Sequence, residues 1–464
     1  MFKDRGFYFH TKKGTVYYYN DRDGTVQIAE RVKKEEHTIE TSSSCEKDLP
    51  DIETSDIQGY LKSEGYRQLT LITTQDCNLR CLYCVYSGNY SNMRTHQTSY
   101  MTPDVAREAI KRYFEGFVHV KRRNPYRIPA IGFYGGEPLR NFDLICQAVE
   151  FAKGLYPGRI LFNLTTNGTI LTDKMIQFFH DNDFALAISL NGPQTEHDRL
   201  RIFPGGTGTF SIVWDNLQKI REKYPNYYRE KCSVLVCYDV GTDLKTVTNF
   251  FEINGDVLPP IGRVSLVSPR FTDWYDRYST QQKVNFVHLQ EACRERYFTQ
   301  LVNGEKVFIV LEALFGMAYQ MAMNRPQNIP FRPHYLYLPY TGTCIPGDKI
   351  AVDPQGDFHC CERINEQFPT GDIETGVDIE KIVTLIDLYR RQIYPECFDC
   401  PITRLCSVCY ATVAGNGKFE RNPSDLCTII RKDIKVRFEM LWSLFEAGVK
   451  ESDILKISDP FPDF

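Results

Sequence analysis

The sequence has no apolar run that approaches the ~20 residues needed to cross a bilayer. Residues 1–5, MFKDR, do not lead into the apolar core of a secretory signal. There is no excess of basic charge either, because 55 Lys and Arg stand against 59 Asp and Glu, which leaves a net charge of −4. These absences predict a cytoplasmic protein whose partners include neither a membrane nor a nucleic acid.

Disulfides are rare in cytoplasmic proteins, yet this chain contains 16 cysteines among its 464 residues. Three lie within residues 77–84 and eight within residues 344–427. Thiolates are soft ligands, and grouped cysteines of this kind bind iron–sulfur clusters or zinc. The remaining five are scattered, and we interpret them as ordinary small apolar residues: Cys45, Cys146, Cys232, Cys237 and Cys293.

The first cysteine set is Cys77, Cys81 and Cys84, with three and then two residues between neighbours. A structural zinc ion or an ordinary four-iron cluster takes four protein ligands, and no fourth cysteine lies nearby. Three ligands on a four-iron cluster would leave one iron open for a small molecule. The alternatives are a zinc site completed by a distant residue and three structural cysteines with accidental spacing.

This CxxxCxxC pattern, with the aromatic Tyr83 just before the last cysteine, resembles the signature of the radical S-adenosylmethionine (SAM) superfamily. The resemblance implies that the three cysteines hold a 4Fe–4S cluster that binds SAM, with Tyr83 at the cofactor. It also implies that an electron splits SAM into methionine and a 5′-deoxyadenosyl radical, which takes a hydrogen atom from a substrate carbon. The protein then positions the groups and excludes water.

From residue 68 onward, near-continuous apolar strands alternate with helices, which predicts an α/β fold with a parallel sheet covered on both faces. Ligands of such folds lie at the carboxyl ends of the strands, where the distinctive loops of this sequence also fall. The six units resemble the partial (β/α)6 barrel of the radical SAM family. The predicted strands are 69–73, 128–134, 160–165, 184–190, 233–238 and 263–267, and the predicted helices include 56–64, 102–117, 175–180, 212–223 and 432–445.

The loop of Gly135, Gly136, Glu137 and Pro138 follows the second predicted strand and matches the family's GGEP loop. Glycine lets a backbone approach a ligand closely. By resemblance, this loop binds the amino group of SAM, with Glu137 as an acceptor.

Further SAM contacts, to the ribose and the carboxylate, fall by resemblance on Thr165, Asn167 and Ser189, although Asn-Gly and Ser also form ordinary turns. Arg201 ends a stretch that resembles a recurrent HDxxR motif. It either pairs with a carboxylate of the cofactor or forms a structural salt bridge. Family members often have aspartate where this chain has Asn191, so we assign no acid–base role to that position.

The second cysteine set, with Gly356 five residues before Cys361, resembles the SPASM domain, which holds two auxiliary 4Fe–4S clusters. One departure is that only two residues, rather than three, separate Cys406 from Cys409. A zinc ribbon formed by Cys397, Cys400, Cys406 and Cys409 is the alternative. The SPASM resemblance implies an outer cluster held by Cys397, Cys400, Cys406 and Cys427, and an inner cluster held by Cys344, Cys361 and Cys409.

The inner set lacks a fourth cysteine where fully ligated relatives have one, because Leu338 stands six positions before Cys344. Cys360 is a rival of Cys361, but neighbours on an extended chain point to opposite sides, so one cluster should not take both. We therefore hypothesise an open iron that binds a substrate thiolate, as the thioether-forming maturases of this family are understood to do. Glu362 stands where sulfatase-maturating relatives carry an acidic base.

These features predict a radical SAM oxidoreductase that installs thioether crosslinks, from cysteine sulfur to carbon, in a ribosomally made precursor peptide. One alternative is an anaerobic sulfatase-maturating type of enzyme, which oxidises cysteine or serine to formylglycine. Others are a carbon–carbon crosslinking or epimerising maturase and a non-catalytic iron–sulfur scaffold or sensor. The expected cofactors are SAM and three 4Fe–4S clusters. The expected partners are a precursor peptide, with a leader and a cysteine-containing core, and an electron donor such as flavodoxin or ferredoxin.

The start of the chain is aromatic-rich, and residues 7–9 and 16–19 predict short strands. Residues 31–56 are charged and rich in Ser and Thr, which predicts a mobile linker. Many peptide-modifying relatives begin with a module that docks a leader peptide as an added strand. This segment is shorter, so a hairpin that caps the barrel is the alternative. The predicted parts are 1–66 (β-rich segment and linker), 67–270 (partial barrel), 271–343 (helical bridge) and 344–464 (SPASM domain with a C-terminal helix).

Overall fold

The computed structural model describes residues 5–29, 50–324, 337–338 and 343–454. Its centre is a ten-stranded sheet. Six strands, in chain order and all parallel, correspond one for one to the predicted strands, so the predicted α/β fold is confirmed. They are β4 (Gln68–Thr74), β5 (Ala130–Gly135), β6 (Leu161–Thr166), β7 (Ala185–Ser189), β8 (Cys232–Tyr238) and β9 (Ile261–Leu266).

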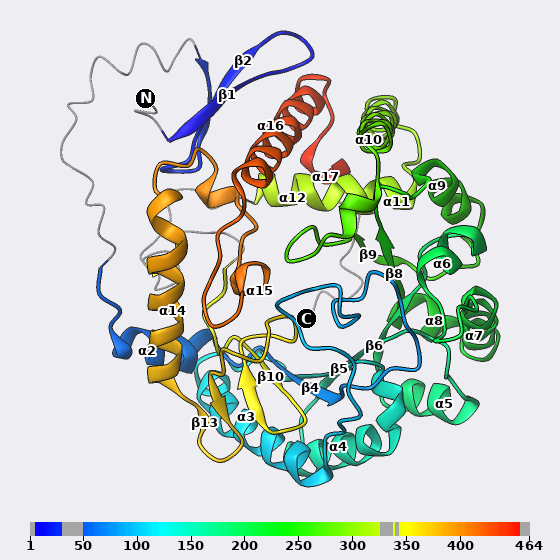
Figure 1. Ribbon diagram of the computed structural model, residues 1–464, viewed down its shortest axis with the longest axis vertical. Coiled ribbons are helices and arrows are strands. Elements are labelled where there is room, and N and C mark those ends of the chain that lie inside the picture. Colours follow the sequence, from blue (N-terminus) through cyan, green and yellow to red (C-terminus); the bar gives the residue numbers. More distant parts are fainter. Residues whose placement is uncertain (1–4, 30–49, 325–336, 339–342, 455–464) are drawn as a thin grey trace.

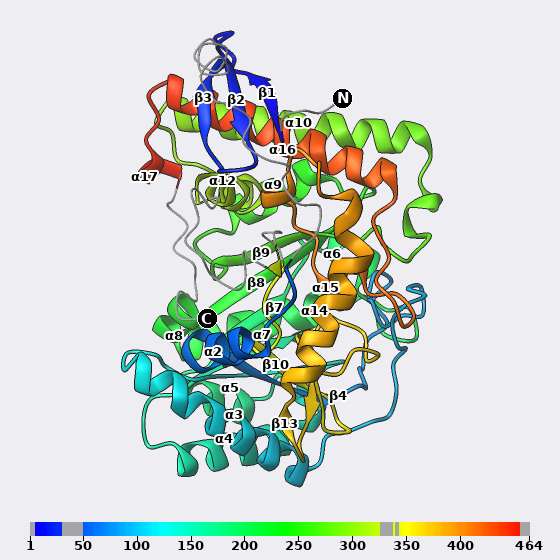
Figure 2. The ribbon, with the colours of Figure 1, turned by 90° about the vertical axis from the view of Figure 1, so that its left-hand side faces the viewer.

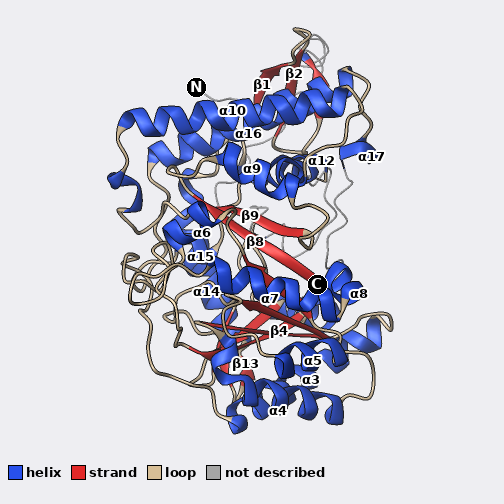
Figure 3. Ribbon diagram, turned by 90° about the vertical axis from the view of Figure 1, so that its right-hand side faces the viewer, coloured by secondary structure: helices blue, strands red, loops and turns tan. Residues whose placement is uncertain are grey.

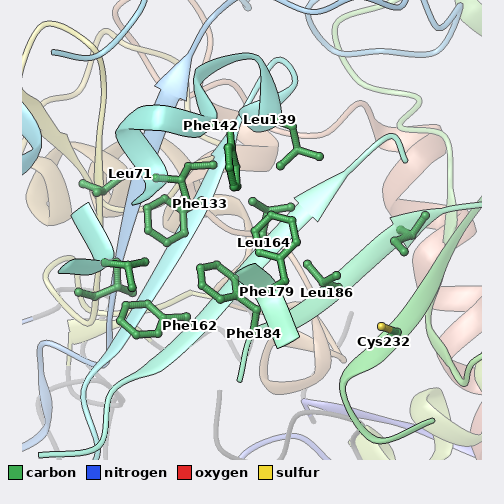
Figure 4. Close-up of a cluster of buried hydrophobic side chains, with 14 of the residues drawn as sticks. Leu71, Phe133, Leu139, Phe142, Phe162, Leu164, Phe179, Phe184, Leu186 and Cys232 are labelled. Carbon is green, nitrogen blue, oxygen red and sulfur yellow. The ribbon is translucent and has the colours of Figure 1, made fainter. Parts of the chain in front are cut away.

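Helices lie along the outer face of these six strands (Figure 1). Large apolar side chains of the strands fill the space beneath them. Phe162 and Phe184 stack at 5.3 Å between ring centroids, and Figure 4 shows Phe133 and Leu164 beside them. The outer helices are α3 (Pro103–Arg123), α4 (Phe142–Leu155), α5 (Asp173–Asp181), α6 (Gln194–Leu200), α7 (Phe210–Lys223), α8 (Pro225–Lys231) and α9 (Leu244–Ile253).

The start of α3 follows from its first residues. The Thr102 side chain accepts a hydrogen bond from the backbone N–H of Val105, and Pro103 occupies the first helical position. The helix continues beyond the predicted end at residue 117, because Val120 extends the buried face. Three basic residues in its last turn stabilise the carboxyl end of the helix dipole.

The cysteine-rich region is joined directly to this sheet. The order of strands is β13-β12-β11-β10-β4-β5-β6-β7-β8-β9. β10 pairs in parallel with β4, which leads into the first cysteine loop, so the two cysteine sets are carried by neighbouring strands. The added strands are β10 (Lys349–Val352), β11 (Asp357–His359), β12 (Gly371–Asp372) and β13 (Gly376–Val377).

A second apolar core lies between the barrel and the cysteine-rich loops. Its helices are α2 (Thr54–Glu64), α14 (Ile379–Ile393) and the short α15 (Tyr410–Val413). Ile57 and Leu61 of α2 and Ile382 and Ile386 of α14 are fully buried or nearly so in it. This core positions residues 344–361 against residues 397–410.

The N-terminal strands form a separate antiparallel sheet that stands at one end of the molecule (Figure 2). Phe9 packs edge-on against Phe438 and Trp442 of α16, with ring centroids 5.6 and 5.5 Å apart. The predicted strands are thus confirmed, and they pack on the C-terminal helix. The elements are β1 (Gly6–His10), β2 (Val16–Asn20), β3 (Val26–Ile28) and α16 (Ser424–Glu446).

Helices bridge the barrel to this end of the molecule, as Figure 3 shows for α10 above β8 and β9. Within the predicted bridge of residues 271–343, residues 280–302, 309–311 and 317–323 are helical. Most of the predicted linker lies outside the described residues. Among the helices that are described, none combines the length and apolar character needed to span a bilayer. The bridging helices are α10 (Thr280–Val302), α11 (Ile309–Leu311) and α12 (Met317–Met323), and α17 (Glu451–Ile454) follows α16.

Candidate functional site

The first cysteine loop leaves the carboxyl end of β4 with donors directed at its sulfurs. The Cys77 sulfur accepts from the backbone N–H of Leu79 at 3.4 Å and from the Asn167 amide at 3.8 Å. The Cys84 sulfur accepts from the backbone N–H of Tyr86 at 3.4 Å. Burial raises the pKa of Cys77 to about 12 and that of Cys84 to about 11. Half-buried sulfurs with N–H donors are suited to iron–sulfur ligation, in which such hydrogen bonds tune the cluster.

The GGEP loop lies directly against the backbone that leads to Cys77. A Cβ on Gly136 would lie 2.1 Å from the Asp76 carbonyl oxygen, and one on Gly135 would lie 2.3 Å from the Thr74 carbonyl oxygen. The backbone N–H groups of Gly136 and Glu137 donate to those two oxygens, Gly136 to Thr74 and Glu137 to Asp76, each at 2.8 Å. The close approach that the glycines permit is therefore to the cysteine loop itself.

Glu137 is fully buried just before the short helix that begins at Pro138, and it ties this loop to the next one. Its Oε1 accepts from the Thr166 hydroxyl at 2.8 Å and from the backbone N–H of Leu139 at 3.1 Å. Its Oε2 accepts from the backbone N–H of Asn167 at 2.7 Å. Burial raises the pKa of Glu137. Both oxygens are engaged within the protein, and the role as acceptor for SAM stays a prediction.

Arg201 reaches the first cysteine loop. Its guanidinium donates to the Tyr83 hydroxyl at 2.6 Å, and it lies near the Cys81 thiol. Its Nε is buried and has no hydrogen-bond partner among the described residues. The partner that the structure provides for Arg201 is thus a tyrosine hydroxyl, in place of the salt bridge considered from the sequence.

The other residues of the predicted cofactor site are spread over two loops. Thr165 and Ser189 are half-buried at the carboxyl ends of β6 and β7. Asp198 of the HDxxR stretch supports α7, because its Oδ1 accepts from the backbone N–H groups of Thr209 and Phe210 at 2.7 and 2.8 Å. The structure thus brings Tyr83, Glu137, Asn167 and Arg201 to the cysteine loop and gives Asp198 a structural role.

Cys237 was missed by the sequence interpretation, which treated it as an ordinary apolar residue. The Tyr83 hydroxyl and the Arg201 guanidinium lie near its thiol. Along β8, Leu235 and Cys237 are half-buried while Val236 is buried, so alternation turns Cys237 away from the helices. The only feature of the sequence that could have indicated this role is that Cys237 stands just before the end of a predicted strand. The interpretation holds for Cys146, Cys232 and Cys293, which pack among apolar side chains, and Cys45 lies outside the described residues.

The second cysteine set separates into two groups. Within each group, burial and the neighbouring thiols raise the pKa of two members. Thr403 fixes one loop by donating to the carbonyl oxygens of Cys397 and Cys400 at 2.7 and 3.1 Å. Cys361 is an electrostatic neighbour of Cys409. The groups are Cys344, Cys361 and Cys409, and Cys397, Cys400, Cys406 and Cys427.

A single zinc ion needs its sulfur ligands within about 2.3 Å of one point. In the part of the chain that the structure describes, no group of three or more His, Cys, Asp or Glu side chains is arranged to hold a single metal ion. The assignment of both cysteine groups as ligands of four-iron clusters stays a prediction.

Cys360 corrects one sequence expectation. The Cys360 thiol donates a hydrogen bond to Cys361, which lowers the pKa of Cys361, so the two side chains do not point apart. The expectation was wrong because β11 ends at His359, and the alternation of an extended strand does not continue through the pair. Cys360 is 1% exposed and shares an apolar cluster with Leu338, against which Cys344 and Cys361 pack.

Glu362 lies where the cysteine-rich region meets the first cysteine loop. The Tyr86 hydroxyl donates to its backbone carbonyl oxygen at 3.4 Å. Its carboxylate forms long ion pairs, with Arg363 Nε at 3.6 Å and with Lys349 Nζ at 3.9 Å. Its side chain is 13% exposed, and Oε2 has no hydrogen-bond partner among the described residues.

Residues 71–243 match the radical SAM superfamily. The chain contains a radical SAM domain. The radical SAM match runs from the second half of β4 through β8 and includes the cysteine loop, the GGEP loop and Arg201. The resemblance noted from Cys77, Cys81 and Cys84 is thereby confirmed at the level of the domain.

Several curated proteins are similar to the chain. A cysteine-type anaerobic sulfatase-maturating enzyme of Clostridium perfringens is 28% identical over 347 residues, which are 71% of this chain and 84% of that enzyme. The radical SAM cyclopropyl synthase TigE of Paramaledivibacter caminithermalis is 24% identical over 403 residues, 84% of this chain and 77% of that enzyme. Other matches are partial, since a cysteine-type enzyme of Clostridium novyi matches at 26% identity over 39% of this chain and only 46% of its own length.

A solved structure supports the fold. Native anSMEcpe with bound AdoMet superimposes with a TM-score of 0.58 at 18% identity, over 82% of this chain and 99% of that one. At this identity, the likeness shows that the two chains share a fold.

Proposed function

We propose that this chain is a radical SAM enzyme that oxidises a side chain of a peptide or protein substrate, with Glu362 as the base. The observation that carries the proposal is the place of Glu362. It follows Cys361 in the inner group and is tied through its carbonyl oxygen to Tyr86, two residues after Cys84. One carboxylate, whose Oε2 accepts no hydrogen bond from the described residues, thus lies between the two cysteine sets.

The residues present fit the implied cofactors. Cys77, Cys81 and Cys84 offer three sulfurs beside one another, and two of these sulfurs accept N–H donors. The buried Nε of Arg201 has no partner among the described residues and suits an anionic group of a cofactor. When bound, a 4Fe–4S cluster with SAM supplies a radical that removes a hydrogen atom from a substrate carbon, and auxiliary clusters supply an electron acceptor.

The role of Glu362 is to accept a proton from the substrate side chain. A cysteine or serine side chain that has lost a hydrogen atom from Cβ must also lose its S–H or O–H proton and one electron to become a thioaldehyde or an aldehyde. Glu362 would take that proton at Oε2, while Arg363 and Lys349 hold the carboxylate in position. Hydrolysis of a thioaldehyde then gives formylglycine.

Thioether formation is the second candidate. The observation that favours it is Leu338, which is fully buried and offers no ligand to the inner group from the position where fully ligated relatives have cysteine. An open iron would then bind a substrate thiolate. Carbon–carbon crosslinking and epimerisation use the same scaffold, and no contact described here selects them.

The substrate would be a precursor peptide or a protein segment, and a flavodoxin or ferredoxin would deliver the electron. Support for a protein substrate comes from the similarity to a sulfatase-maturating enzyme, and the similarity to a cyclopropyl synthase keeps other radical SAM reactions in view. The three-stranded sheet of β1 to β3 is the candidate element for leader recognition, because β3 forms one of its edges.

The test uses the anaerobically reconstituted protein, SAM and a reductant, with peptides that carry Cys, Ser or Ala at one position. We expect 5′-deoxyadenosine with the Cys or the Ser peptide. In the product of the Cys peptide, oxygen replaces the cysteine sulfur and two hydrogens are lost. The product of the Ser peptide has lost two hydrogens. A thioether product would lose two hydrogens and keep its sulfur, which would select the second candidate. SAM cleavage with no change in any peptide would contradict the proposed substrate class, and no cleavage at all would favour a scaffold.

Glu362→Gln tests the base directly. Glu380, exposed in the first turn of α14, provides the matched control Glu380→Gln. The proposal predicts that only the first variant cleaves SAM without forming product. Equal product from both variants would remove Glu362 from the mechanism.

A further inference from the structure

The backbone around Cys81 is paired with a segment that lies far away in the sequence. The two residues that flank Cys81 donate their backbone N–H groups to carbonyl oxygens of this segment, Arg80 to Ile202 at 2.8 Å and Leu82 to Leu200 at 2.9 Å. Cys81 and the residue between the two acceptors thus lie opposite each other, as in an antiparallel pair of strands. The groups that hold this segment in place therefore also place the backbone of Cys81.

The segment of residues 200–202 is held by a chain of buried hydrogen bonds. The Thr209 hydroxyl donates to the carbonyl oxygen of Arg201 at 3.1 Å and lies 2.9 Å from Nε2 of His197. Nδ1 of the same ring accepts from the backbone N–H of Asn191 at 3.3 Å, so the ring proton is on Nε2. His197 therefore donates to Thr209, and Thr209 donates to Arg201. His197 is 0% exposed and Thr209 is 1% exposed, so water does not compete for these bonds.

The HDxxR stretch gains a physical explanation from this chain. His197 contacts the hydroxyl of Thr209, and the neighbouring Asp198 accepts from the backbone N–H of the same residue at 2.7 Å. A Cβ on Gly208 would lie 2.1 Å from the carboxyl carbon of Asp198, so the chain before Thr209 closes tightly on this carboxylate. The first two residues of the stretch thus fix Thr209, and Thr209 fixes the backbone of Arg201, its last residue.

We propose that His197 and Thr209 are positioning residues of the first cysteine loop. They act through Arg201, whose backbone they hold and whose guanidinium donates to the Tyr83 hydroxyl at 2.6 Å. A displacement of residues 200–202 would move the backbone of Cys81 and the contact with Tyr83 together. The inference rests on the SAM-cleaving step of the proposed function and is independent of how the substrate is modified.

Hydrogen exchange of the full-length, anaerobically reconstituted protein tests the inference on peptides that cover residues 78–83. Thr209→Val keeps the shape of the side chain and removes both hydrogen bonds of the hydroxyl. Exchange of these peptides should become about 30-fold faster, because each lost bond contributes roughly fivefold. Thr209→Ser keeps the hydroxyl and should retain most of the protection.

Thr248→Val is the matched control. The Thr248 hydroxyl is also buried and donates to the carbonyl oxygen of Leu244 at 2.6 Å, within α9. Its loss should not change the exchange of residues 78–83 or the rate of SAM cleavage. In Thr209→Val, the kcat for 5′-deoxyadenosine should fall by up to about 100-fold, the cost of a displacement of about 1 Å at a reaction centre.

Two variants of His197 decide the question should Thr209→Val fail to fold. His197→Gln can place an amide N–H where Nε2 lies and keep the bond to Thr209, whereas the shorter side chain of His197→Asn cannot reach it. The glutamine variant should therefore protect residues 78–83 better than the asparagine variant.

Four results would overturn the inference. They are unchanged exchange of residues 78–83 in Thr209→Val, equally fast exchange in Thr209→Ser, and equal exchange in the two His197 variants. The fourth is an equal rise of exchange in β5 and β6, because a general loss of stability would then explain the effect. None of these exchange measurements depends on turnover. Absence of 5′-deoxyadenosine from the unaltered protein would instead contradict the proposed function.

Discussion

Gly136→Ala is the most direct test of how the GGEP loop positions the first cysteine set. The new Cβ would lie 2.1 Å from the Asp76 carbonyl oxygen and 3.2 Å from the backbone nitrogen of Cys77. Both are backbone atoms, which cannot rotate away as a side chain can. To restore an ordinary contact of 3.4 Å, the two loops must separate by roughly 1.3 Å. The φ of Gly136 is not positive, so the effect is steric and not conformational.

This displacement has two costs. Overpacking of this kind destabilises by about 1–3 kcal/mol. The hydrogen bonds from Gly136 to Thr74 and from Glu137 to Asp76 also lengthen from 2.8 Å. Because Cys77 follows Asp76, the first sulfur moves with the loop, and a shift of about 1 Å at a reaction centre costs about 100-fold in rate.

The assay compares 5′-deoxyadenosine formation by Gly136→Ala with that by Gly154→Ala. Gly154 lies in α4, where a Cβ would meet nothing within 4 Å, so alanine there should stabilise the helix by about 0.5–1 kcal/mol and leave the rate unchanged. Iron held by the second cysteine set should be equal in both variants. Equal rates of SAM cleavage would refute the argument, because the loop would then tolerate the displacement without moving Cys77.

Three further outcomes are expected. Alanine at Cys77, Cys81 and Cys84 together should abolish 5′-deoxyadenosine and keep the iron of the second set, and residual SAM cleavage would contradict the ligand assignment. Glu362→Gln should lower product formation about 100- to 10,000-fold, measured by mass spectrometry, while SAM cleavage persists. Burial raises the pKa of Asp21 to about 6, so its contribution to stability is present below about pH 4 and is lost as pH rises through about 6. In the Asp21→Asn variant, the urea concentration at the unfolding midpoint should no longer fall as pH rises through about 6. If the midpoint still falls as in the unaltered protein, other groups cause the decline.

The six parallel strands could be predicted because each is a buried apolar run, and buried runs bounded by turns carry a strong signal. Their ends shifted by a residue or two. The end of α3 shifted further, because continuation to Arg123 depends on Val120 meeting the core, which is a property of the packing. The first cysteine set could be predicted because its spacing is distinctive, whereas the division of the second set into two ligand groups stays a prediction.

The chemistry of single residues could not be predicted in the same way. A lone cysteine such as Cys237 carries no spacing signal, and its polar neighbours Tyr83 and Arg201 come from other strands and loops. The rule of strand alternation failed at Cys360 because it was applied one residue past the end of the strand. Both errors concern where a side chain points, which depends on backbone geometry that the sequence pattern does not contain.

The contact between Asp21 and Arg404 is a further feature that no local pattern could reveal, because 383 residues separate the two. The backbone N–H of Arg404 donates to the Asp21 carboxylate at 3.0 Å, and its Nε donates to the Asp21 carbonyl oxygen at 2.6 Å. The same guanidinium donates to the carbonyl oxygen of Arg22. Since Arg404 stands two residues before Cys406, the N-terminal sheet holds the loop of the outer cysteine group.

Arg404→Ala should therefore loosen both ends of this contact. Two side-chain hydrogen bonds are lost, at about 1 kcal/mol each, which corresponds to roughly 30-fold easier local opening of β1 and β2. Hydrogen exchange measures that opening, and iron release to a chelator measures the outer group. Arg107→Ala is the control, because among the described residues Arg107 pairs only with Asp104, and that pair is exposed. Faster exchange in β1 and β2 with normal iron retention would show that the sheet docks on this loop without supporting it. Unchanged exchange would show that the aromatic contacts with α16 hold the sheet by themselves, and the argument for coupling would fail.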